Sequence, residues 1–192
     1  MKNTLQYMML WIVLCTTACT HTPSRCVQLP SSTGQYCLQP STLVEPFAVQ
    51  QTVEINYRDV HEVMITDLDV SQSGLQMIAF TPFGQKLMQV NDNNVNIVAE
   101  NPLGARLDPA MLVALLQLAL WPSDAVKQGL SPSLTLMEAG AERTVLSGNQ
   151  VILHMQYANK LVLYQQLSID MPRMQFSLNI STLVDSTDAI AQ

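Results

Sequence analysis

The chain has 192 residues, enough for one domain with a sizeable core, and a net charge of −6 at pH 7. Only 12% of the residues are charged, 48% are hydrophobic, and 18 are glutamines, so the uncharged surface is expected to be rich in amides. Nucleic-acid binding needs a positively charged stripe, and the sequence has no cluster of lysine and arginine. We therefore expect no nucleic-acid partner.

The N-terminus has the pattern of a bacterial export signal. Lys2 precedes a short apolar run, Leu5 to Leu14, and small residues then lead to Cys19. This junction resembles a lipobox, which predicts a lipoprotein signal peptide over residues 1–18 and a lipidated Cys19, acylated for example with palmitate. Thr20 rather than aspartate follows the cysteine, and in the sorting logic implied by the resemblance this favours the outer membrane. The alternative is an ordinary cleaved signal peptide with a leftover cysteine.

Two further cysteines, Cys26 and Cys37, enclose a stretch rich in turn-forming residues. In an exported protein such a close pair predicts a disulfide. The rival interpretation is a metal site, but the spacing does not fit and only His21 lies nearby. We predict no metal and no cofactor, and we expect residues 19–33 to form a short tether ahead of a domain over residues 34–184.

The rest of the chain is mainly extended. Short apolar runs separated by Gly, Asn, Asp and Pro turns fill residues 47–100 and return after residue 130. One helix is predicted between them, because Asp108 and Pro109 form a helix start and Pro122 a stop. It is apolar on every side except for Gln117, so it must be buried. These patterns predict a mainly β fold, an incomplete antiparallel β-barrel of about ten strands with a helical plug on its concave side, and a loose tail over residues 185–192.

No arrangement of residues suggests catalysis, so we expect no enzyme. His61 and His154 fall in strand patterns, where a histidine on the polar face is the simpler interpretation. Asp67 and Asp69 share one face of a strand, and paired carboxylates can perform acid–base chemistry, but a solvated strand end is the simpler interpretation here too.

Several segments resemble, in order, the outer-membrane receptor of the bacterial lipoprotein localisation (Lol) pathway: "MIAFTPFGQKLMQVNDNNVNIVAEN", "PAMLVALLQLALWP", "GNQVILHMQYAN" and "IDMPRMQFSLNISTLV". The stretches "YCLQP" and "LQLALWP" are similar to those of an outer-membrane lipoprotein family encoded beside aryl polyene biosynthesis clusters. The resemblance implies a barrel with an apolar cavity for acyl chains. It also implies that Phe83, in the Pro-Phe-Gly loop, contacts the membrane or releases cargo. Alternatively, Phe83 folds back onto the sheet.

Together these expectations predict that the chain is an outer-membrane lipoprotein that binds an amphiphile and helps transfer it to the outer membrane. The amphiphile would be a lipid, such as an aryl polyene lipid, or the acyl chains of a lipoprotein, and a periplasmic carrier protein would be a partner. The alternative is a structural lipoprotein subunit that docks on an envelope assembly. Each candidate cavity residue has plain core packing as its simpler interpretation; the candidates are Met77, Leu87, Leu112, Leu116, Trp121, Leu153, Met155, Phe176 and Leu178.

Overall fold

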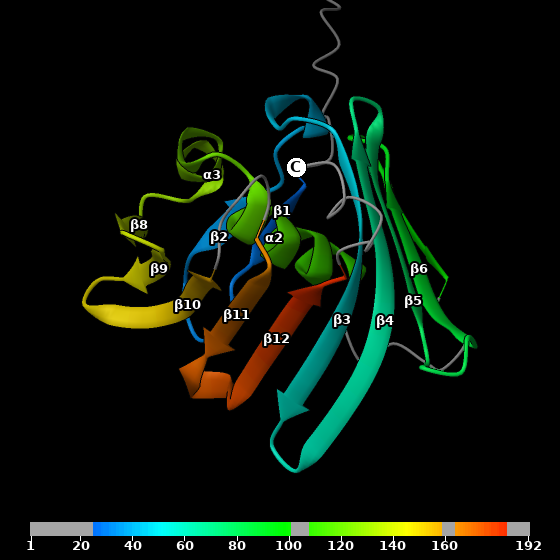
Figure 1. Cartoon of the computed structure of the whole chain (residues 1–192). Coiled ribbons are helices and arrows are strands. Elements are labelled where there is room, and N and C mark those ends of the chain that lie inside the picture. The colour runs from blue at the N-terminus through cyan, green and yellow to red at the C-terminus, as the bar shows by residue number, and fades with distance from the viewer. Residues whose placement is uncertain (1–24, 101–107, 159–163, 184–192) are drawn as a thin grey trace, which may run out of the picture.

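The computed structural model describes residues 25–100, 108–158 and 164–183 (Figure 1). The predicted signal peptide, Cys19 and the tail after residue 184 lie outside the described residues, as does His21. The strands are β1 Cys26–Gln28, β2 Gln35–Cys37, β3 Phe47–Tyr57, β4 Val60–Ser71, β5 Gly74–Phe80, β6 Lys86–Asp92, β7 Ile97–Glu100, β8 Leu134–Ala139, β9 Glu142–Ser147, β10 Gln150–Ala158, β11 Gln166–Met171 and β12 Phe176–Thr182. The helices are α2 Pro109–Leu120 and α3 Ser123–Gly129, with short 3-10 turns η2 Ser41–Leu43 and η3 Pro172–Met174.

Ten of the strands form one antiparallel sheet in the order β7-β6-β5-β4-β3-β12-β11-β10-β9-β8. The sheet is not closed, because β7 and β8 are its two edges. Figure 1 shows the sheet curving around α2, which lies against its inner face. The predicted fold class, a mainly β incomplete barrel with a helical element, is confirmed.

Side chains alternate between the two faces of the sheet, as the period of a strand requires. In β12 the inner residues Phe176, Leu178 and Ile180 are buried, whereas Asn179 and Ser181 are exposed on the outer face. The inner face is therefore apolar and the outer face largely polar, so the core lies inside the curve.

Helix α2 begins and ends where the sequence predicts. The carboxylate of Asp108 accepts a hydrogen bond from the backbone N–H of Ala110 at 3.0 Å, and Pro109 occupies the first turn. Residues Val113 to Ala119 are all buried. With seven consecutive buried residues, the helix must be covered on more than one side.

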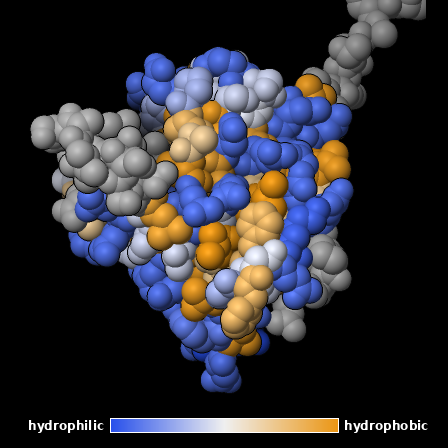
Figure 2. Space-filling view, turned by 45° about the vertical axis from the view of Figure 1, so that its right-hand side comes forward, coloured by the Kyte–Doolittle hydropathy of each residue, from blue (hydrophilic) through white to orange (hydrophobic). Residues whose placement is uncertain are grey.

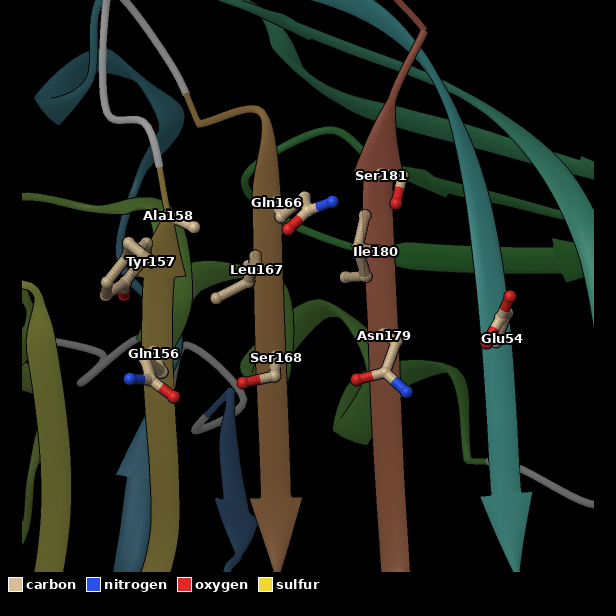
Figure 3. A pocket seen from close by; sticks show the side chains of 10 residues that line it. All are labelled: Glu54, Gln156, Tyr157, Ala158, Gln166, Leu167, Ser168, Asn179, Ile180 and Ser181. Atoms are coloured by element: carbon tan, nitrogen blue, oxygen red, sulfur yellow. The ribbon is translucent and has the colours of Figure 1, made fainter.

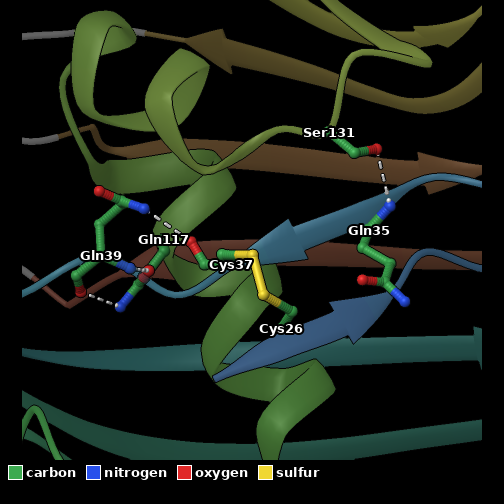
Figure 4. The surroundings of a disulfide bond; sticks show 6 residues. All are labelled: Cys26, Gln35, Cys37, Gln39, Gln117 and Ser131. Carbon is green, nitrogen blue, oxygen red and sulfur yellow. Dashed lines mark hydrogen bonds between the residues drawn. A yellow bond between two sulfur atoms is a disulfide. The ribbon is translucent and has the colours of Figure 1, made fainter. Parts of the chain in front are cut away.

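The second cover is the β1–β2 hairpin, which passes over α2 on the side away from the large sheet (Figure 4). Tyr36 of β2 is fully buried, and its hydroxyl donates to the Gln117 side-chain oxygen at 3.2 Å. Arg25, just before β1, forms an ion pair with Asp92 at the end of β6. We expected residues 19–33 to form a tether, but from Arg25 onward they belong to the folded domain. The buried apolar side chains of Val27 and Leu29 are part of the cover over the helix.

Cys26 and Cys37 face each other in the hairpin and form a disulfide (Figure 4). The bond closes a loop with a sequence separation of 11 residues. It thus fixes a hairpin of only two short strands, which would be marginal by itself.

Removal of this disulfide should weaken the whole domain, since the hairpin covers α2. We expect the Cys26→Ala/Cys37→Ala double variant to lose about 2–3 kcal/mol of unfolding free energy, measured by urea denaturation. Wild-type protein in reductant should unfold at the same urea concentration as the variant. An unchanged wild-type midpoint, with alkylation showing both thiols released, would contradict the structural role of the bond.

Candidate functional site: an apolar cavity beneath α2

A cavity of about 60 Å³ lies between α2 and the inner face of the sheet. It is formed by strands from both halves of the sheet and by the N-terminal and middle turns of the helix. The lining residues are Gln51, Val53, Ile55, Met64, Thr66, Met77, Met88, Leu112, Leu115, Leu116, Ile169, Phe176, Leu178 and Ile180. All except Gln51 and Thr66 are apolar, so the cavity suits an apolar ligand or the apolar part of an amphiphile.

The structure brings five of the candidate cavity residues together around this space: Met77, Leu112, Leu116, Phe176 and Leu178. They come from β5, α2 and β12, which are distant in sequence.

Leu87 does not line the cavity. The pairing of β5 with β6 shifts register between Ala79 and Phe80, and Met88 pairs with Ala79. Ala79 is buried on the inner face, so Met88 takes the inner position that we expected for Leu87. Met88 shares this face with Val90, two residues further on, as the period of a strand requires.

The other three candidates, Trp121, Leu153 and Met155, are buried in the core but are not among the lining residues. Trp121 ends α2, and its indole N–H donates to the Pro40 carbonyl at 3.1 Å. It borders a separate surface groove of about 580 Å³, which Phe47 and Tyr164 also line.

Sequence reasoning missed the lining residues of β3 and β4, above all the two polar ones. Gln51 is 2% exposed and Thr66 is 4% exposed. The loose alternation of "FAVQQTVEINY" was the available signal, because it places Gln51 on the same face as Val53 and Ile55.

Directional hydrogen bonds hold the C-terminal half of α2. The Gln117 side chain accepts from the backbone N–H of Gln39 at 2.7 Å and donates to its carbonyl at 2.8 Å (Figure 4). The third partner of Gln117 is Tyr36, and burial raises the pKa of that phenol well above its usual range, so Tyr36 stays a neutral donor. The only polar residue among the buried turns thus fixes the helix to the hairpin.

Arg143 of β9 is a second attachment. Its guanidinium donates to the carbonyl oxygens of Leu118 at 2.8 Å and Trp121 at 2.9 Å, where the helix leaves carbonyls unpaired and its dipole favours a cation. Glu138 accepts from Arg143 at 2.8 Å. Burial alone would raise the pKa of Glu138, but hydrogen bonds from Ser123 and Arg143 outweigh it and lower the pKa, so the partner carboxylate stays charged.

The N-terminal half of α2 has a different attachment to the sheet. Leu112, Leu115 and Leu116 meet the strands across the cavity through apolar side chains, and the cap bond of Asp108 stays within the helix. Apolar contacts are non-directional and individually weak. The half of α2 that borders the cavity is therefore the half that can separate from the sheet at the lower cost.

The outer face of the sheet carries a shallow polar groove of about 370 Å³ (Figure 3). Glu54, Gln156, Ser168 and Asn179 come from four neighbouring strands and lie in one row. Among the described residues that line the groove, Glu54 alone is charged. The row is an amide and hydroxyl surface of the kind expected from the glutamine content.

The histidines and aspartates considered above form no catalytic arrangement. His61 bonds to the Asn56 side chain at 2.8 Å, His154 to the Thr144 hydroxyl at 3.1 Å, and Asp67 accepts from Gln50 at 2.9 Å. Within the described ranges, no group of three or more His, Cys, Asp or Glu residues is placed to hold a metal ion. Nor does any helix of these ranges have the length and hydrophobicity to span a bilayer.

Phe83 lies in the loop between β5 and β6 and is 98% exposed. It therefore does not fold back onto the sheet, which was the alternative considered above. Val63 of β4 and Val98 of β7 are further apolar residues that are exposed, at 38% and 60%. Figure 2, turned so that the side carrying β4, β5 and β6 comes forward, shows hydrophobic side chains in a band between hydrophilic ones.

Residues 48–184 match a family of proteins of unknown function, DUF3261. The chain belongs to the DUF3261 family. The matched span contains every residue that lines the cavity, whereas the β1–β2 hairpin precedes it. No curated protein matches the chain. Membership in DUF3261 carries no statement about aryl polyene lipids or lipoprotein transport.

The cavity should lower the cost of truncating the side chains that face it. Leu118 is fully buried in packed core, so Leu118→Ala should cost about 2–5 kcal/mol of unfolding free energy. Leu116→Ala, two residues earlier in α2, should cost about 1 kcal/mol less, because part of Leu116 already faces the cavity and loses fewer contacts. Urea denaturation of both variants measures the difference, and a larger loss for Leu116→Ala would show that no space exists there.

Proposed function

We propose that the chain is a lipid-anchored protein at the periplasmic face of the bacterial outer membrane. It binds an amphiphile in the cavity beneath α2 and helps transfer it to that membrane. The cavity carries the proposal, because its lining is largely apolar and because hydrogen bonds within the described residues attach the C-terminal half of the covering helix but not its N-terminal half. The amphiphile is a lipid, with aryl polyene lipids and the acyl chains of lipoproteins as the candidates that the resemblance implies, and a periplasmic carrier protein would deliver it.

Binding requires the cavity to widen. Pockets for drug-sized ligands measure about 300–1,000 Å³, far more than the about 60 Å³ found here. The hydrogen bonds of Gln117 and Arg143 keep the C-terminal half of α2 in place, so the helix would swing at its N-terminal half. Three methionines line the cavity, and their flexible side chains can adapt to a chain that enters.

The test is photo-crosslinking of a fatty acid with a diazirine in its chain to the full-length protein in its own membrane. Labelled peptides should come from α2 and from β3 to β5. Met64→Trp, which fills the half-buried side of the cavity, should abolish this labelling. Val63→Trp places the same residue on the outer face of the same strand and should leave labelling unchanged. Wild-type labelling confined to the outer face or to the Phe83 loop would contradict the proposal.

The exposed Phe83 would contact the membrane or the leaving cargo. Burying an aromatic ring in lipid contributes about 1.5–3 kcal/mol. An aromatic residue at this tip is therefore a large part of a weak, reversible membrane contact.

A tryptophan at this position should report the contact. In full-length protein reconstituted in vesicles with brominated lipids, the fluorescence of Phe83→Trp should be strongly quenched. The control is Met137→Trp. Met137 lies on edge strand β8 and is 57% exposed, and a tryptophan there should be quenched little. Equal quenching at the two positions would remove Phe83 as a membrane contact.

One observation favours the second candidate, a structural lipoprotein subunit that docks on an envelope assembly. The open sheet ends at β7 and β8, where Val98 is 60% exposed and Met137 is 57% exposed. Unpaired edge strands are ready sites for pairing with another chain. This candidate predicts crosslinks from β7 or β8 to another protein and no fatty-acid label in the cavity.

A further inference from the structure

Two polar side chains interrupt the apolar lining of the cavity and lie next to each other. Gln51 of β3 and Thr66 of β4 are cross-strand partners, and both point to the inner face. Both are among the most buried lining residues, whereas Ile55, Met64, Met88 and Leu112 are half-buried and mark the open side. The polar pair therefore lies at the deep side of the cavity.

Neither side chain is fully hydrogen-bonded. The amide nitrogen of Gln51 donates to the Tyr164 hydroxyl at 2.7 Å and to the Thr182 hydroxyl at 3.5 Å, which uses both of its N–H groups. Its carbonyl oxygen accepts no hydrogen bond from any described residue. The Thr66 hydroxyl likewise bonds to no side chain or backbone group within the described ranges. Within the described ranges, the fully enclosed side-chain atoms without a partner are Arg25 Nε and Gln150 Nε2, so the Gln51 oxygen and the Thr66 hydroxyl reach the open space of the cavity. Polar groups that border an apolar cavity without a protein partner call for a ligand group that can bond to them.

We propose that the buried end of the ligand carries a hydroxyl group, which donates to the Gln51 carbonyl oxygen and accepts from the Thr66 hydroxyl. This inference rests on the proposed function, since it names the class of amphiphile that the cavity takes. A methyl-terminated chain would leave both protein groups unpaired. A charged end is disfavoured, because none of the described residues that line the cavity carries a charge to compensate it.

The first consequence concerns the ligand-free protein. Thr66→Val keeps the shape of the side chain and removes the unpaired hydroxyl, so it should raise the midpoint of urea denaturation. Thr52→Val is the control on the outer face of β3 and should leave the midpoint nearly unchanged. A lower midpoint for Thr66→Val would show that the hydroxyl has a structural partner, such as a resident water, and would overturn the inference.

The second consequence concerns selectivity. 12-Hydroxydodecanoic acid and tridecanoic acid have chains of equal length that differ only in a terminal hydroxyl or methyl group. Both compete with the diazirine fatty acid for the cavity of full-length protein in the same membranes. Thr66→Val should reduce the preference for the hydroxy acid by about three- to tenfold relative to wild type. Each competitor partitions into the lipid equally for all variants, so partition cancels when the preference of a variant is divided by that of wild type. The control Thr52→Val should show the wild-type preference.

The outcomes separate the two proposals. Wild-type protein without cavity labelling overturns the proposed function and this inference with it. Cavity labelling with the same preference in wild type and Thr66→Val leaves the proposed function standing and overturns the hydroxyl inference alone.

Discussion

The fold depends on the burial of α2, a helix that is apolar on nearly every side. A surface helix needs only one covered face, but Val113 to Ala119 are all buried and require cover all around. The curved sheet supplies one cover and the β1–β2 hairpin supplies the other (Figure 4). The Arg25–Asp92 ion pair and the disulfide serve the same requirement, because the ion pair attaches the hairpin to the large sheet and the disulfide joins the two strands of the hairpin to each other.

The two halves of α2 are attached in different ways, and this difference is the basis of the proposed amphiphile binding. Gln117 and Arg143 fix its C-terminal half through hydrogen bonds to Gln39 and to the helix-end carbonyls. Its N-terminal half meets the sheet through leucine side chains around a small cavity. A helix that is hydrogen-bonded at one end and held by apolar contacts at the other can move away from the sheet at the second end without unfolding.

The sequence predicted the parts of this arrangement that depend on local pattern. The cap at Asp108, the stop at Pro122 and the need to bury α2 follow from residue types alone, and so does the alternation in β12. Leu87 was misplaced because Leu87 and Met88 are adjacent apolar residues, and only the pairing of β6 with β5 shows that Met88 and Val90 take the inner face. The sequence did not predict Gln51 and Thr66 as lining residues, because a single glutamine or threonine in a strand carries no such signal. Only the pairing of β3 with β4 places them together inside an apolar cavity.

The central claim is that an amphiphile occupies the space beneath α2. An experimental structure of the full-length chain, purified from its own membrane with lipid shown to be present by mass, tests it most directly. Binding of an amphiphile there predicts density for a chain between α2 and strands β3 and β4, with the N-terminal half of the helix displaced and its C-terminal half still bonded to Gln39 and Arg143. Lipid density elsewhere, with Leu112 and Leu115 packed on the sheet as here, would contradict binding beneath α2.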